Sequence, residues 1–170
     1  VHCGRGAAHP RLGPRGPELA ILAPSGLRLA LSLHAPTQEL RERLLPRAAR
    51  AWKLPELLEA LRAFEATGRG VLLEYTLLAG LNDTHECADA LADLIASAQL
   101  RPTGVNLIPY NPTLAGSRAG FESPSDERCK GFRAQLRQRG VGNVTVRFST
   151  KLGRGQRAAC GQLGLSASSA

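Results

Sequence analysis

The 170-residue chain contains no methionine, only 4% aromatic residues, and no long apolar run. A membrane-spanning helix needs roughly 20 consecutive apolar residues, so the sequence predicts no membrane partner. The amino terminus also lacks the apolar segment of a secretory signal. Hydrophobic residues at 43% and charged residues at 21% are ordinary for one globular domain.

The chain has four cysteines, Cys3, Cys87, Cys129 and Cys160, and none of them forms a CxxC pair. No histidine stands at zinc-finger spacing from them, which argues against a structural zinc site. Reduced thiols in an intracellular compartment fit better than a disulfide framework. Cys87 and Cys129 fall within helical patterns and are predicted to be packing residues. No metal ligand is predicted in this chain.

Acidic residues are absent from the last quarter of the chain. From Arg128 onward there are nine Lys and Arg residues and no Asp or Glu, so this segment accounts for the net charge of +8. A segment of one sign is typical of proteins that contact phosphates. A solvated basic surface without a partner is the alternative.

Residues 1–20 and 166–170 show no hydrophobic period and are predicted to be irregular. Between them, strands are predicted at 27–33, 71–78, 105–108 and 144–148. Helices are predicted from Thr37 to Leu45 with Pro46 ending the first, from Leu54 to Gly68, from an Asp83-x-x-Glu86 capping box to Ala98, and from Ser123-Pro124 to Arg139. This alternation predicts an α/β fold of parallel strands with right-handed crossovers.

Each predicted strand has one apolar face and one face with polar groups. Ser32, Glu74, Asn106 and Thr145 lie on the polar faces by strand parity. A parallel sheet wrapped by helices is apolar on both faces, whereas a barrel with a ligand in its lumen is not. Four strands are too few to close a (β/α) barrel, so we expect roughly half of one. The alternative is a sheet with one face in water.

The run Ala158-Ala159-Cys160-Gly161-Gln162-Leu163 follows a basic loop at 151–157. Neighbouring cations favour the thiolate, which is the nucleophilic form of cysteine. Cys160 is therefore a candidate catalytic nucleophile. Its alternative is a small buried hydrophobic residue.

Three further stretches fall where such barrels carry their chemistry, at the ends of strands. They are Ser32-Leu33-His34-Ala35-Pro36, Glu74-Tyr75 with Leu81-Asn82-Asp83, and Asn106-Leu107-Ile108-Pro109-Tyr110-Asn111-Pro112. Together with the Cys160 run, and in this order, they resemble the radical-SAM rRNA adenine-C2 methyltransferase family. The resemblance extends from about residue 27 to residue 163.

The resemblance implies a partial (β/α) barrel of the radical-SAM type, of which residues 21–165 are the carboxyl-terminal half. It implies S-adenosyl-L-methionine and a [4Fe-4S] cluster as cofactors, an electron donor, and large-subunit rRNA as substrate, with tRNA in some members. Ser32, Leu33, His34 and Asn111 would contact S-adenosylmethionine. Cys160 would be methylated and carry the carbon to the base.

Adenine C2 lies between two ring nitrogens and is too electron-poor to attack a methyl sulfonium. By resemblance, a methyl group first moves to the Cys160 thiolate, and a radical then abstracts a hydrogen from it. The carbon radical adds to C2, and a second cysteine releases the product through a disulfide. Gly153, Gly155 and Gly161 suit a mobile loop that meets an extruded base. The basic last quarter would hold the RNA backbone.

The sequence departs from the family in four respects. The CxxxCxxC cluster motif, a Gly-Glu pair, an upstream serine strand and the resolving cysteine do not occur in it. Residues 1–20 resemble a mis-joined or frame-shifted start. We expect the carboxyl-terminal half of a longer enzyme or a truncated gene product, inactive and poorly soluble alone. The expected compartment is the cytoplasm, or a plastid or other organelle in a eukaryote.

Three alternative functions stay open: an adenine-C8 methyltransferase, a catalytically inactive RNA-binding remnant, and a plain α/β domain. The individual residues also have structural alternatives. Ser32 could cap a turn, His34 could be a buried hydrogen-bonded histidine, and Asn111 before Pro112 could be a turn residue. Glu74 and Arg147 could form a structural ion pair.

Overall fold

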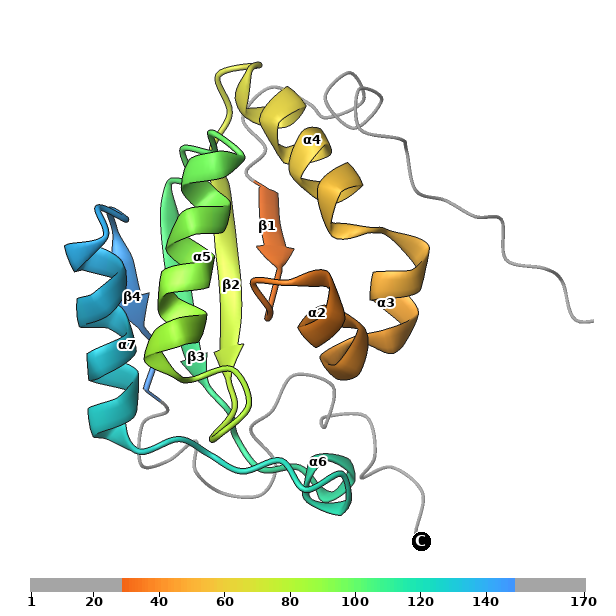
Figure 1. Cartoon of the computed structure of the whole chain (residues 1–170), viewed down its shortest axis with the longest axis vertical. Helices are drawn as coiled ribbons and strands as arrows, with labels where there is room; N and C mark the ends of the chain where they lie inside the picture. Colours follow the sequence, from red (N-terminus) through yellow and green to blue (C-terminus); the bar gives the residue numbers. More distant parts are fainter. Residues whose placement is uncertain (1–28, 149–170) are drawn as a thin grey trace, which may run out of the picture.

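The structure, a computed structural model, describes residues 29–148 (Figure 1). Its four strands form one parallel sheet in sequence order, as the alternating pattern predicts. They are β1 (Leu29–Ser32), β2 (Val71–Leu77), β3 (Gly104–Pro109) and β4 (Val144–Val146). The α/β class and the four-strand partial barrel are confirmed. The observed fourth strand ends two residues earlier than predicted, at Val146.

Six helices connect the strands of this part of the chain. They are α2 (Gln38–Leu44), α3 (Pro46–Ala51), α4 (Leu54–Glu65), α5 (His85–Ser97), α6 (Leu114–Arg118) and α7 (Asp126–Gln138). Helices α4, α5 and α7 lie alongside the sheet (Figure 1). They supply the buried helical residues of the core. No helix among residues 29–148 is both long and apolar enough to cross a membrane.

The apolar face of the sheet forms the core, as strand parity predicts. On β2 the side chains of Val71, Leu73, Tyr75 and Leu77 are all at most 1% exposed, and the residues between them are half-buried. The Tyr75 ring packs on Phe132 of α7 with ring centroids 5.4 Å apart. Apolar area removed from water contributes about 25 cal/mol per Å², so this face holds the helices against the sheet.

The opposite face carries a row of polar side chains that crosses all four strands. The register aligns Ser32 with Glu74, Glu74 with Asn106, and Asn106 with Thr145. Strand parity predicts only that each of these side chains faces away from the core. The register adds that all four lie side by side across the sheet. We call these four residues the polar row.

Two predicted helix starts are wrong by one or two residues. Helix α5 is capped by Thr84, whose Oγ1 accepts from the Cys87 N–H over 3.2 Å, and not by Asp83. Helix α7 is capped by Ser125 rather than Ser123. All of these residue types make good caps, so sequence alone does not choose between close neighbours. Thr37, in contrast, caps α2 as predicted.

Two short helices were not predicted. Pro46 is the first residue of α3, where its missing N–H would have no helical partner. The prediction that the first helix ends at Pro46 is correct, since α2 ends at Leu44. That Pro46 also begins a second helix was not predicted from the sequence. Helix α6 has only five residues and is capped by Thr113. A helix of that length carries too little hydrophobic period to be recognised.

Candidate active site

The motif-bearing loops lie at one edge of the sheet. All four strands are parallel, so the segments that follow β1, β2 and β3 leave the sheet at its carboxyl edge. Ser32 ends β1, His34 follows it, and Asn111 comes two residues after β3. Ligands of open α/β sheets bind at this edge. The fold therefore brings three of the predicted site residues to the same edge, with β2 between the first two and Asn111.

His34 is held in an uncommon backbone conformation, with φ at 58°. Its imidazole Nδ1 accepts a hydrogen bond from the Thr76 main-chain N–H over 2.9 Å. Just before it, the Leu33 N–H donates to the Glu74 carbonyl over 2.9 Å. The imidazole thus extends the β1–β2 pairing by one bond. Because Nδ1 is an acceptor, the neutral ring carries its proton on Nε2.

The environment favours the neutral form of this ring. Burial lowers the pKa of His34 below its usual value of 6.5, Glu74 opposes that shift, and Arg41 adds to it. A neutral imidazole with Nδ1 occupied has one donor left, the Nε2–H. His34 can therefore be both a buried, hydrogen-bonded histidine and a ligand contact, because its Nδ1 serves the fold and its Nε2–H remains as a donor.

Asn82 organises the carboxyl edge and is 0% exposed. Its Nδ2 donates to the His34 carbonyl over 2.9 Å and to the Thr76 carbonyl over 2.7 Å. Its Oδ1 accepts from the Leu78 N–H over 2.7 Å, and the Tyr75 hydroxyl donates to its carbonyl over 3.1 Å. The sequence places Asn82 in a motif but does not indicate its role. From sequence alone, an asparagine in a loop is most simply explained as a turn residue. Its hydrogen bonds to the ends of two strands are visible only in the structure.

Asp83 stabilises the same loop. Its side chain is fully buried and accepts from the Gly80 N–H over 2.8 Å and from Arg128 Nε over 2.9 Å. Arg128 lies at the first turn of α7, so this ion pair ties the β2–α5 loop to that helix. Loss of the cation from a buried carboxylate is strongly destabilising where solvent cannot reach the charge that is left.

Part of the basic segment is used inside the fold. Arg128 pairs with Asp83, Arg139 pairs with Asp89 and Asp93 of α5, and Arg137 donates to the Val144 carbonyl. These arginines brace α7 against its neighbours. The predicted phosphate-binding surface is accordingly smaller, within the described residues, than the charge count suggests.

The polar row is linked by side-chain hydrogen bonds. Asn106, only 4% exposed, donates from Nδ2 to Glu74 Oε1 over 3.4 Å and accepts from the Thr145 hydroxyl over 3.3 Å. The suggested Glu74–Arg147 ion pair does not occur among the ion pairs of residues 29–148. Asn106 lies in the position next to Glu74 instead, and it is a neutral partner.

The remaining predicted site residues differ in their placement. The Ser32 side chain is exposed at the end of β1, and Asn111 is half-buried. Leu33 is 1% exposed within the core, so its side chain faces away from the polar row. Only its main chain is available to a ligand at this edge. Cys160 and the basic loop at 151–157 lie outside the described residues.

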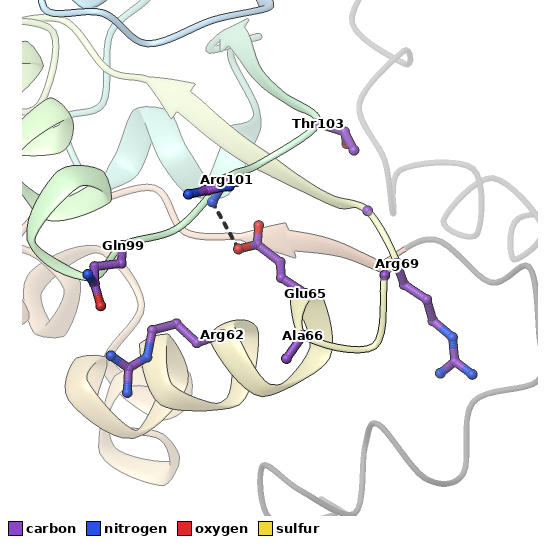
Figure 2. A pocket seen from close by; sticks show the side chains of 9 residues that line it. Arg62, Glu65, Ala66, Arg69, Gln99, Arg101 and Thr103 are labelled. Atoms are coloured by element: carbon purple, nitrogen blue, oxygen red, sulfur yellow. Dashed lines mark hydrogen bonds between the residues drawn. The ribbon is translucent and has the colours of Figure 1, made fainter.

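A pocket of about 600 Å³ lies at the opposite, amino edge of the sheet (Figure 2). It is formed by the segments before β2 and β3, and its charged lining consists of Arg62, Glu65, Arg69 and Arg101. Figure 2 shows Glu65 accepting from the Arg101 main-chain N–H, a bond of 2.9 Å. None of the predicted site residues within 29–148 lines this pocket.

No group of three or more His, Cys, Asp or Glu side chains in residues 29–148 could hold a metal ion. Cys129 is fully buried in α7 and Cys87 is half-buried in α5, which agrees with their predicted packing roles.

Comparisons with known proteins find related RNA methyltransferases. A probable dual-specificity RNA methyltransferase RlmN of Synechococcus sp. (strain RCC307) is 46% identical over 157 residues, covering 91% of this chain and 42% of that protein. Its counterpart in Deinococcus deserti is 42% identical over 149 residues, covering 87% and 40%. The chain thus spans about two fifths of the length of these curated relatives. No family model matches it.

The solved structures point the same way. A radical SAM methyltransferase from Sphaerobacter thermophilus has a TM-score of 0.73 and 43% identity, covering 88% of this chain and 41% of that one. A domain of pyruvate-formate lyase-activating enzyme from Bacteroides vulgatus has a TM-score of 0.55 and 17% identity, and shows the fold alone. The parallel sheet thus has the fold of a radical-SAM methyltransferase. Over its matched residues, the chain belongs to the RlmN family of radical-SAM RNA methyltransferases.

Proposed function

We propose that this chain is part of an enzyme that methylates C2 of adenine in large-subunit rRNA, and also in tRNA, with S-adenosyl-L-methionine. The proposal is supported by the position of Ser32, His34 and Asn111 at one edge of the sheet, in a chain 46% identical to a probable dual-specificity RNA methyltransferase. The cytoplasm or an organelle is the compartment in which these RNA substrates occur.

The residues at the carboxyl edge suit S-adenosylmethionine, which presents hydroxyl, amino and carboxylate groups. Ser32 supplies an exposed hydroxyl, His34 an Nε2–H donor of fixed orientation, and Asn111 a half-buried amide. Leu33 would contribute through its main chain, because its side chain is in the core. When bound, the cofactor supplies the methyl group and the radical chemistry of the reaction.

Cys160 is proposed as the nucleophile that accepts the methyl group, on the basis of its motif. The cluster and its electron donor would depend on residues other than 29–148, in which no metal-binding group occurs. A CxxxCxxC motif in frame upstream of Val1 in the coding DNA would support this division. A start codon next to Val1, with no such motif, would favour the catalytically inactive RNA-binding remnant.

The proposal is tested by nucleoside mass spectrometry of RNA from cells that lack their own adenine methyltransferase. The gene is expressed with its natural upstream sequence, as wild type, Cys160→Ala and the control Cys87→Ala. We expect 2-methyladenosine from wild type and Cys87→Ala only. Formation of 8-methyladenosine would instead support the adenine-C8 enzyme, and methylation by Cys160→Ala would overturn the role of that thiol.

A further inference from the structure

The polar row contains a carboxylate, that of Glu74, and none of the predicted site residues has one. Ser32 and Glu74 are register partners on adjacent strands. Neighbouring strands lie about 4.8 Å apart, and their side chains at one level point to the same face. A ligand that reaches the Ser32 hydroxyl on this face is therefore within reach of the Glu74 carboxylate.

The carboxylate is held in place but not neutralised. Asn106, which is 4% exposed, donates its Nδ2–H to one carboxylate oxygen over 3.4 Å. The Thr145 hydroxyl donates to Asn106 Oδ1, which fixes the orientation of that amide so that its donor points to Glu74. Within residues 29–148 the carboxylate has this one side-chain hydrogen bond, a long one, and no ion pair.

A half-buried carboxylate with such weak internal compensation favours a ligand that brings donors or positive charge. The charge of Glu74 acts on the carboxyl edge of the sheet, because it opposes the lowering of the His34 pKa by burial. S-adenosylmethionine carries a sulfonium, an ammonium and two ribose hydroxyls. It therefore has both the charge and the donors that this position lacks.

We propose that Glu74 is a ligand-contacting residue that accepts hydrogen bonds from S-adenosylmethionine, and that Asn106 positions its carboxylate. This inference rests on the proposed function, since it takes the ligand from it. Glu74 thereby joins Ser32 and His34 in one site, and the face of the sheet opposite the helices becomes a wall of that site.

The test is isothermal titration calorimetry of the full chain with S-adenosylhomocysteine and with 5′-methylthioadenosine. The variants are Glu74→Gln, which keeps the shape and removes the charge, and Asn106→Leu, which removes the positioning amide. Glu65→Gln is the matched control, because that half-buried carboxylate also accepts one hydrogen bond but lies at the amino edge. Thermal unfolding of each variant establishes that it is folded.

We expect Glu74→Gln to weaken S-adenosylhomocysteine binding at least tenfold, Asn106→Leu to weaken it less, and Glu65→Gln to leave it unchanged. An equal loss for 5′-methylthioadenosine would assign the contact to the ribose hydroxyls, and a loss for S-adenosylhomocysteine alone would assign it to the ammonium. Tight binding by folded Glu74→Gln would overturn the inference and leave the proposed function standing. Absence of binding by the wild-type chain would overturn the inference that this face contacts the ligand, whereas the proposed function is decided separately by the methylation assay.

Discussion

The side-chain amide of Asn82 donates to the main-chain carbonyl of His34 over 2.9 Å, although 48 residues separate them. The same amide reaches the Thr76 carbonyl, so one buried side chain joins the ends of β1 and β2. A non-glycine residue at φ 58° persists only where its surroundings hold it there. Asn82 supplies that support, which makes the geometry of the candidate site a property of two loops rather than one.

Asn82→Ala should destabilise the fold and release His34. The change leaves the His34 and Thr76 carbonyls and the Leu78 N–H without their partner, and each such buried group costs about 1–3 kcal/mol. We expect a loss of about 3 kcal/mol in the free energy of unfolding, measured by urea denaturation. The His34 imidazole signals in NMR spectra should change as well.

Asn143→Ala is the matched control for that variant. Asn143 also donates to a carbonyl, that of Thr103, but it is exposed at the amino edge, and unlike Asn82 it has a positive φ of 49° itself. Water replaces its hydrogen bond, so we expect a loss of about 1 kcal/mol. Equal costs at both positions would contradict the role given to Asn82.

The stability of the fold should fall as the pH drops below the usual His pKa of 6.5. Burial lowers the pKa of folded His34, so the unfolded chain binds a proton before the folded one does. Stability rises with pH wherever the unfolded state binds more protons, so this contribution is complete above pH 6.5 and declines below it.

Urea denaturation from pH 8 down to pH 5 measures this effect, with His34→Gln as the comparison. The groups that face His34 are Glu74, which raises its pKa, and Arg41, which lowers it. The part of the pH dependence that His34 causes should vanish in His34→Gln. An unchanged profile in that variant would assign the dependence to other groups.

The Asp83–Arg128 pair should respond unequally to removal of its two partners. Asp83→Ala deletes a fully buried carboxylate that organises Gly80 and Arg128, and should cost about 3 kcal/mol. Arg128→Ala should cost about 1 kcal/mol, because the arginine side chain is 52% exposed and water can reach the carboxylate left behind. The free energy of unfolding of each variant measures the difference. An equal loss from both changes would show that the carboxylate is not reached by solvent.

The thiols should differ in reactivity. Burial, with Asp126 and Asp83 nearby, raises the pKa of the Cys129 thiol to about 11. Because the thiolate is the reactive form, Cys129 should resist iodoacetamide at pH 8 until the chain is unfolded. Peptide mass spectrometry should find Cys87, which is half-buried, alkylated earlier. Rapid alkylation of native Cys129 would contradict its place in the core.

The sequence predicts the sheet well because its signal is local. Alternation along Val71–Leu77 identifies both faces of β2 from the residue types alone. The alignment of Glu74 with Ser32 and Asn106 depends on the register between strands. The lengths of the connecting loops do not fix that register, so the polar row could not be predicted from the sequence. Asn82 was missed for a similar reason, since its partners come from two strands. Cys160 stays a prediction, because it lies outside the described residues.

The most direct test of the account is to map the ligand site on the isotopically labelled chain by NMR. S-adenosylhomocysteine is titrated into the 15N-labelled protein, and the backbone amide shifts are assigned to the two edges of the sheet. The account predicts shifts at Leu33, His34, Thr76 and Asn111, and none at Gln99 or Arg101 beside the amino-edge pocket. Shifts confined to the amino edge, or no shifts at saturating ligand, would contradict it.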